Sequence, residues 1–518
     1  MYNMRTLLLI LMLPLTAKGQ DLNKLFVLPG TVTTVIKTLL IDQDTIVAFG
    51  GVIDIPGHIG IHISKYDTLG HLLSYNTYFH PQEKPYYLAA AAGFIKTSDG
   101  GYLGVGDINL GDAIVVFKFS HTGDLEWSKE IEDLSLRVQY GFIPVECNGG
   151  YVIPGFIQYD NYEINGLIYK ISTNGNILWR KDYGVAGPGD LIGIIIKKDD
   201  NTFFASGGQY TLLDLDDANF WSRNWVFEMD STGTLMSEWR SAIADRLTTC
   251  LIRLSGETEL IYITVKNHPT PTDPSLPALI EFVMRKMDTN DWHIIWQTSQ
   301  TGPDMTYLVS WQNLEQSPID GAWDVVGTCQ HFPNAFVMSG ILAHVNPEDG
   351  STIWLRKDTA YISPLLNINE NYLRSIGHLS SGSIIAGGFV LSTEGGDLHQ
   401  EAWLLKLSPG GCLEPDDCPT VAAHEPGTAK GPSFLNWEVF PNPATNYTML
   451  MPNRDLQGRE GKVALFDVQG KMSREFAFCV PAHEAIRVDL SGLPLGLYTY
   501  QVQVGGQDQG RGRIMVMW

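Results

Sequence analysis

The chain consists largely of short apolar runs that alternate with clusters of turn residues. A clear example is the stretch before residue 131, whose runs are Gly93–Thr97, Tyr102–Asp107, Ala113–Phe119 and Leu125–Glu130. Gly and Asp are concentrated between the runs, as at Gly100-Gly101 and Gly123-Asp124. Such runs predict antiparallel strands joined by tight turns. The stretch therefore predicts a unit of four β-strands.

Versions of this unit recur along most of the chain. The turn glycines Gly70, Gly123, Gly175 and Gly233 follow one another at intervals of roughly 50–60 residues, and we count seven copies. Four strands per copy at this period predict the blades of a β-propeller. A two-sheet sandwich or a β-solenoid is the alternative, but a solenoid needs a shorter period and a sandwich does not repeat one motif. The expected fold is all-β, with a seven-bladed propeller at residues 20–418.

A tryptophan follows the second turn in most copies. These residues are predicted to pack between neighbouring blades, because each is large and apolar and follows a tight turn; they are Trp127, Trp179, Trp239, Trp296 and Trp354. The pattern Gly-x-x-x-Trp after an apolar strand resembles the repeat of quinoprotein-type propellers. In that family the tryptophan docks on the adjacent blade. The resemblance implies no cofactor, since the matching residues are those that dock blades.

The seventh copy lacks a good fourth strand. Its place is taken by residues 412–419 (CLEPDDCP), whose prolines and acids disfavour a strand. Lys24–Leu28 is a spare strand, and we predict that it completes the seventh blade and closes the ring. Cys412 and Cys418 flank the acidic loop and are a candidate disulfide, with two free thiols as the alternative.

The chain ends in a second predicted domain. Residues 419–435 are rich in Pro, Ala, Gly and Thr and predict a linker. Residues 436–518 show alternating strands that predict a small antiparallel β-sandwich. This part resembles the C-terminal sorting domain of type IX secretion cargo. The matching residues are Pro441, Asn442, Pro443, Asp467, Gly470, Asp489, Leu490, Gly496 and Tyr498. The resemblance implies that the secretion machinery and its sorting peptidase are partners, and that the cell belongs to the Bacteroidota.

The N-terminus carries a predicted export signal. Arg5 precedes the apolar run Leu7–Leu13, and Ala17-Lys18-Gly19 provides a small-x-small cleavage site. Residues 1–19 are therefore predicted to be removed, which places the protein outside the cell or on its surface. The apolar run is shorter than the roughly 18 residues that a membrane span requires, so no integral span is expected.

Charge and motifs narrow the function without naming it. The formal net charge of −22 disfavours nucleic acid as a partner. His58 and His62 would share one face of a strand, and Asp214, Asp216 and Asp217 could offer oxygen ligands. Ordinary half-buried histidines and a solvated insertion are the competing interpretations. No catalytic motif occurs, so we predict no catalytic, cofactor or metal residues.

Two functional hypotheses remain. The first is a non-catalytic surface propeller that presents a glycan or protein ligand face. The second is a secreted hydrolase or lyase that acts on polysaccharide. Acids of raised pKa near the inner strands would favour the enzyme, whereas Trp221, Trp225 and Trp311 on an open face would favour binding. The insertions at 209–224 and 266–279 are where the copies differ most.

Overall fold

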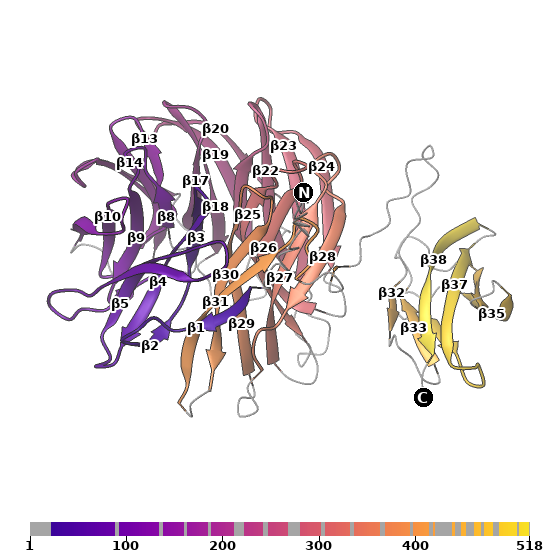
Figure 1. The fold of residues 1–518 in the computed structure, drawn as a ribbon. Helices are drawn as coiled ribbons and strands as arrows, with labels where there is room; N and C mark the ends of the chain where they lie inside the picture. Colours follow the sequence, from indigo (N-terminus) through magenta and orange to yellow (C-terminus); the bar gives the residue numbers. More distant parts are fainter. Residues whose placement is uncertain are drawn as a thin grey trace, which may run out of the picture. The chain divides into compact units, whose positions relative to one another are not determined.

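The structure is a computed structural model (Figure 1). It describes residues 22–88, 93–133, 138–159, 163–184, 188–211, 222–241, 247–267, 280–301, 306–331, 336–362, 368–393, 397–413, 418–419, 438–440, 447–451, 460–467, 471–479, 486–504 and 507–516. The chain divides into two compact units, Met1–Ala423 and His424–Trp518, which are described separately.

The first unit contains repeated four-stranded antiparallel groups. The first three are β2 (Thr31–Thr34), β3 (Thr38–Asp42), β4 (Thr45–Asp54), β5 (Ile59–Tyr66) and β6 (Leu72–Tyr78); β7 (Tyr86–Tyr87), β8 (Gly93–Lys96), β9 (Tyr102–Ile108), β10 (Ala113–Phe119) and β11 (Leu125–Ile131); and β12 (Val138–Gly141), β13 (Val145–Cys147), β14 (Gly150–Gln158), β15 (Ile164–Ser172) and β16 (Ile177–Tyr183). In each of these the first strand is split in two, and both pieces pair with the same second strand.

Four further groups follow along the chain. They are β17 (Pro188–Lys197), β18 (Thr202–Thr211), β19 (Ser222–Asp230) and β20 (Leu235–Arg240); β21 (Leu247–Leu254), β22 (Glu259–Asn267), β23 (Ile280–Asp288) and β24 (Ile294–Thr301); β25 (Thr306–Gln316), β26 (Trp323–His331), β27 (Phe336–Val345) and β28 (Thr352–Asp358); and β29 (Ile368–His378), β30 (Ile384–Ser392) and β31 (His399–Leu407), completed by β1 (Asn23–Phe26). A short parallel pairing of β27 with β29 joins the last two groups into one sheet. The four-stranded units predicted for the repeats are confirmed.

The first strands of the groups form an inner ring. Neighbouring first strands lie against each other from β3 to β8, from β13 through β17, β21 and β25 to β29, and from β29 back to β3. Between β8 and β13, a Cβ on Gly93 would lie 2.4 Å from Pro144. The hydrophobic clusters lie between successive groups, because each cluster combines residues from neighbouring groups. One cluster joins Leu39 and Ile46 of the first group to Ile385 and Leu404 of the last. The groups therefore close into a ring, as in a propeller.

The ring is closed by the N-terminal strand. β1 pairs antiparallel with β31, with Asn23 opposite Leu405 and Phe26 opposite Ala402. Nε1 of the fully buried Trp403 donates a hydrogen bond to Oδ1 of Asn23 over 2.8 Å. The prediction that the segment near Lys24–Leu28 completes the seventh group is confirmed.

The repeated tryptophans pack on the following group. A Cβ built on Gly175, Gly233, Gly350 or Gly411 would lie at most 3.0 Å from the indole of Trp127, Trp179, Trp296 or Trp354, respectively. Each of these glycines has a positive φ, between 71° and 78°. Trp239 instead packs edge-to-face on Tyr262 of the next group, with ring centroids 5.6 Å apart. There the turn position with positive φ is held by Trp292, at 62°.

The second unit is an antiparallel β-sandwich. One sheet contains β32 (Glu438–Phe440), β33 (Tyr447–Met451) and β36 (Ile486–Asp489); the other contains β34 (Glu460–Phe466), β35 (Met472–Cys479), β37 (Gly496–Val504) and β38 (Gln507–Val516). Leu450 and Val488 of the first sheet share a core with Val463, Tyr500 and Ile514 of the second. The predicted all-β class is confirmed. Among the described residues there is no helix long and apolar enough to cross a bilayer.

Candidate functional site

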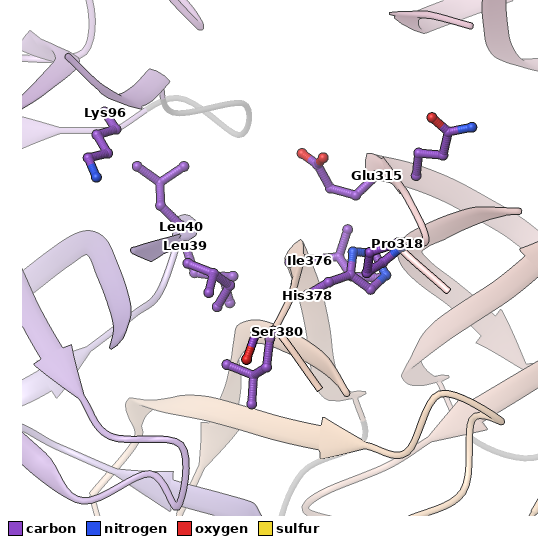
Figure 2. Close-up of a pocket in the computed structure, with 12 residues that line it drawn as sticks. Leu39, Leu40, Lys96, Glu315, Pro318, Ile376, His378 and Ser380 are labelled. Carbon is purple, nitrogen blue, oxygen red and sulfur yellow. The ribbon is translucent and has the colours of Figure 1, made fainter. Parts of the chain in front are cut away.

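A cavity of about 430 Å³ lies where the ends of four inner strands meet. Its walls come from Leu39–Ile41 of β3, Lys96 of β8, Glu315-Gln316 of β25 and Ile376–His378 of β29, with Pro318, Leu379 and Ser380 in the turns beyond (Figure 2). The strands end here because tight turns follow each of them. Apolar side chains make up much of the lining, and a few polar groups are placed among them. This composition is that of a small-ligand site.

A buried chain of hydrogen bonds starts at the cavity wall. Nε2 of His378 lies 2.7 Å from Oδ2 of Asp324, whose Oδ1 lies 2.7 Å from Nδ1 of His344. Nε2 of His344 in turn lies 2.9 Å from Oδ2 of Asp320, which is half exposed. The Asp324 side chain is 2% exposed, so it cannot exchange these partners for water. The chain fixes the ring of His378 against the cavity.

The charges around His344 favour its protonated form. Burial opposes that form, but the hydrogen bonds and charges of Asp324 and Asp320 outweigh it and raise the pKa of His344. Its ring also stacks on Trp354, with centroids 5.2 Å apart. The Asp324 carboxyl thus lies between the rings of His344 and His378.

The other polar groups of the cavity are partly engaged. Lys96 forms an ion pair with Asp42, whose pKa is lowered: burial opposes this shift, and the bonds from Lys96 and Tyr102 outweigh it. Ser380 donates hydrogen bonds to Asp44. Glu315 is the single carboxylate among the described lining residues, and it lies 3.9 Å from Arg253.

A second charged group lies toward the opposite ends of the inner strands. Lys37, just before β3, and Arg374 of β29 both lie over the ring of Phe389, at 5.5 and 5.7 Å from its centroid. Nearby Asp107, at the end of β9, is 1% exposed. Burial raises its pKa to about 7, against the pull of Lys37. Sequence reasoning missed all three residues, since each is one charge inside or beside an apolar run.

The two histidines that were weighed as metal ligands against ordinary half-buried histidines do not come together. His62 is fully buried, with Nε2 3.0 Å from the carbonyl of Val35 and Nδ1 3.1 Å from Oγ of Ser64. His58 pairs with Asp54 instead. Within the described ranges no group of three or more His, Cys, Asp or Glu side chains is placed to hold a metal ion.

Two of the tryptophans that would have favoured binding, had they lain on an open face, are in the core. Trp225 is 3% exposed and Trp311 is 5% exposed, and each belongs to a cluster between groups. These two residues therefore do not form the open aromatic face that would have favoured glycan or partner binding, because both faces of a blade are covered by its neighbours. Trp221, Asp214, Asp216 and Asp217 lie outside the described residues, as do residues 212–221 and 268–279 of the two insertions.

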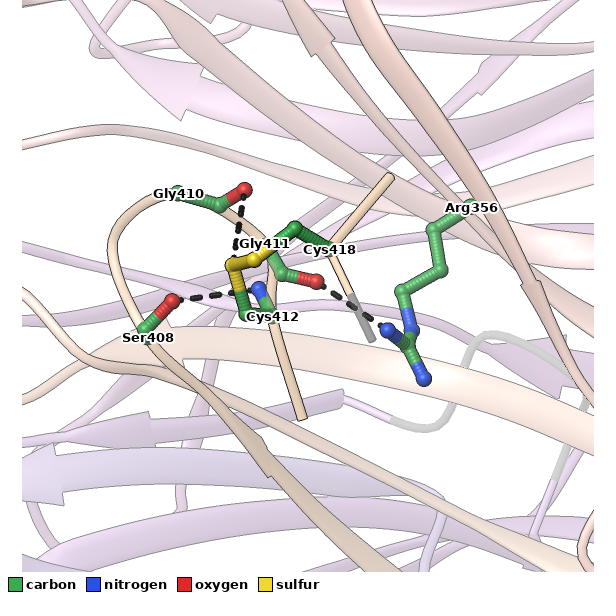
Figure 3. Close-up of a disulfide and its surroundings, with 6 residues drawn as sticks. All are labelled: Arg356, Ser408, Gly410, Gly411, Cys412 and Cys418. Carbon is green, nitrogen blue, oxygen red and sulfur yellow. Dashed lines mark hydrogen bonds between the residues drawn. A yellow bond between two sulfur atoms is a disulfide. The ribbon is translucent and has the colours of Figure 1, made fainter. Parts of the chain in front are cut away.

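The two cysteines after β31 are joined. Cys412 and Cys418 form a disulfide beside the turn at Gly411, whose carbonyl accepts a hydrogen bond from Nη1 of Arg356 over 3.2 Å (Figure 3). Oγ of Ser408 accepts a hydrogen bond from the backbone N–H of Cys412. Gly411 is also the residue on which Trp354 packs.

The predicted sorting residues of the second unit serve its turns and core. Oδ1 of Asp467 accepts the backbone N–H of Lys471, and Oδ1 of Asp489 accepts that of Ser491. Leu490 is buried, and the hydroxyl of Tyr498 donates to the carbonyl of Pro494 over 2.8 Å. Gly496 begins β37. Pro441, Asn442, Pro443 and Gly470 lie outside the described residues.

Comparison with known families decides the identity of this unit. Residues 438–517 match a family described as a secretion system C-terminal sorting domain. The second unit is such a sorting domain. The protein is therefore cargo of type IX secretion, which exports it to the cell surface or the extracellular space. The motif resemblance seen in the sequence is confirmed.

Several solved structures resemble the chain at low sequence identity. They include the Dos1 propeller, at 7% identity and a TM-score of 0.40, covering 75% of this chain and 96% of that one. The polysaccharide lyase Uly1 matches at 8% identity and 0.41, covering 72% and 90%. An α-L-arabinofuranosidase, Arb93A from Fusarium graminearum, matches at 13% and 0.36, covering 62% and 94%. No curated protein matches the chain.

Proposed function

We propose that the protein is an exported β-propeller that acts as a non-catalytic binding or adhesion scaffold outside the cell. The sorting domain at residues 438–517 carries the export part of this proposal. In the proposed sequence of events, residues 1–19 are removed as a signal peptide during export. The sorting peptidase then cuts near the linker at 419–435, and the propeller is released or attached to the outer surface.

The cavity at the ends of the inner strands supports a binding role. Its volume of about 430 Å³ suits a small ligand or a single sugar unit. Hydrolysis of a glycoside ordinarily needs two carboxyl groups on either side of the bond. The described lining of this cavity offers one, Glu315, so its composition favours binding over hydrolysis.

The second candidate function, a secreted polysaccharide hydrolase or lyase, is favoured by one observation. The pKa of about 7 at Asp107 is what a general acid or base near neutral pH requires. However, Asp107 is almost completely buried, and its role there is better explained by the cations beside it.

A glycan array combined with a polysaccharide hydrolysis screen on the exported protein tests the proposal. We expect retention of a glycan without turnover. Gln316→Trp places a large ring at the exposed edge of the cavity and should abolish retention. Gln82→Trp is the matched control, since it changes an exposed glutamine away from the cavity. Release of product from any polysaccharide would reject the non-catalytic role, and retention unchanged by Gln316→Trp would reject the cavity as the site.

A further inference from the structure

Lys37 and Arg374 are two neighbouring cations that no carboxylate neutralises. Neither forms an ion pair in the described part of the chain, and Nε of Arg374 is buried without a hydrogen-bond partner. Both side chains are half-buried, so solvent still reaches them. In a chain of net charge −22, an unpaired pair of cations is unexpected.

Aromatic rings hold the two cations in place. Cζ of Arg374 lies 4.6 Å from the ring centroid of Tyr372, and Tyr372 packs on Phe389 with centroids 4.9 Å apart. Lys37 and Arg374 thus share the ring of Phe389 from two different groups of the propeller. Cation–π contacts position the charges without consuming their hydrogen-bond donors.

The surroundings of Lys37 and Arg374 disfavour the charged form of each side chain. Burial and the charge of Arg374 lower the pKa of Lys37 to about 8, while Asp107 acts in the opposite direction. Burial likewise lowers the pKa of Arg374. An anion bound next to the two cations would favour their charged forms and so raise both pKa values.

Asp107 is the nearby counter-charge but does not pair with them. Both of its carboxylate oxygens are buried and lack hydrogen-bond partners among the described residues. The other titratable groups around the cluster are Glu370 and Tyr372 of β29 and Tyr140 of β12. A buried carboxylate without donors is a poor substitute for a ligand that can accept hydrogen bonds from both cations.

We propose that Lys37 and Arg374 form an oxyanion site, which binds a carboxylate or sulfate group of an extracellular ligand, with Asp107 as a nearby charge that weakens the binding. Two sources share this chemistry, an acidic saccharide and a free inorganic anion. None of the three residues lines the cavity, so this site is separate from the one tested by Gln316→Trp.

Isothermal titration of the exported protein with sodium D-glucuronate, sodium sulfate and D-glucose, at constant ionic strength, tests the site. We expect at least one of the two anions to bind and glucose not to bind. Lys37→Met and Arg374→Met should each weaken anion binding about tenfold, since each removes a charge-assisted contact. Lys129→Met removes an exposed charge from β11 of the propeller and should change nothing.

The variant Asp107→Asn distinguishes an anion-binding role of Lys37 and Arg374 from a purely structural role of these residues. It keeps the shape of the side chain and removes a repelling charge, so we expect anion affinity to rise severalfold. If glucuronate binds more tightly than sulfate, the ligand of the site is an acidic saccharide. If the two anions bind with equal affinity, the ligand is a free inorganic anion. Absence of binding by both anions, equal binding of glucose, or weaker binding in Asp107→Asn would overturn the proposal.

Discussion

The indole of Trp127 occupies the space that a side chain at Gly175 would need. A Cβ on Gly175 would lie 2.9 Å from Cζ3 of Trp127, although the two residues belong to successive four-stranded groups. Gly175 also has a φ of 77°, which L side chains rarely adopt. Glycine is therefore required at this position for two reasons: the turn needs a positive φ, and the neighbouring group needs space for its indole. The same relationship recurs between Trp354 and Gly411 at the end of the ring.

Gly175→Ala should separate these two requirements. The positive φ should cost about 1–2 kcal/mol of unfolding free energy, and displacement of Trp127 a further 1–3 kcal/mol or so. Gly100→Ala is the matched control, because Gly100 has a φ of 85° but nothing within 4 Å of its added Cβ. Calorimetry of both variants measures the difference. Equal losses would show that the indole contact contributes nothing to stability.

Removal of β1 should open the ring. A chain that begins at Val27 loses the pairing with β31 and the burial of Leu22 against Gly70. We expect a loss of about 3 kcal/mol or more from apolar surface returned to water. The freed edge of β31 should also promote association. Calorimetry and size-exclusion chromatography check both effects against a chain that begins at Leu22. An unchanged melting temperature would contradict the role of β1 in closure.

The repeat, the closing strand and the sorting domain could be predicted from sequence because each is a local pattern. Turn glycines and the tryptophans that follow them recur at a fixed period, and the missing fourth strand of the last repeat indicated where β1 belongs. The packing of Leu22 on Gly70 could not be predicted. At this junction a leucine packs on the turn glycine, where a tryptophan packs on Gly175, Gly233, Gly350 and Gly411.

The candidate sites could not be predicted, because closure of the ring creates them. The cavity unites residues 39–41 with residues 376–380, which are far apart in the chain and lie in apolar strands. Lys37, Asp107 and Arg374 likewise come from three groups. The burial of Trp225 and Trp311 could not be predicted either, because the residues that cover them come from neighbouring groups. Both faces of a blade are buried, and that property belongs to the assembled ring.

The disulfide between Cys412 and Cys418 should stabilise the end of the propeller. The bond closes a short loop, with a sequence separation of 6, so its removal should cost about 2 kcal/mol. Mass spectrometry after alkylation without reduction should find these two cysteines unmodified. The double variant Cys412→Ser, Cys418→Ser should melt at a lower temperature than the oxidised protein and at the same temperature as the reduced one. Alkylation of both thiols in the untreated exported protein would contradict the pairing.

His62 should make the propeller sensitive to mild acid. Burial lowers the pKa of His62 to about 4, from 6.5, although the hydrogen bond to the carbonyl of Val35 acts in the opposite direction. Between pH 6.5 and 4 the unfolded chain therefore binds a proton that the folded chain does not. The contribution of His62 to stability is complete above pH 6.5 and is lost as the pH falls through this window.

His62→Gln isolates this contribution from the other titrating groups. Asp107 acts with the opposite sign between about pH 4 and 7, because its pKa is raised on folding. Melting temperatures of wild type and His62→Gln should therefore be compared at each pH from 4.5 to 7.5, in steps of about half a unit. Glutamine retains a donor for the carbonyl of Val35. We expect the variant to be less stable at pH 7.5 and to lose less stability than wild type on acidification. Parallel curves would show that His62 does not titrate between the two states.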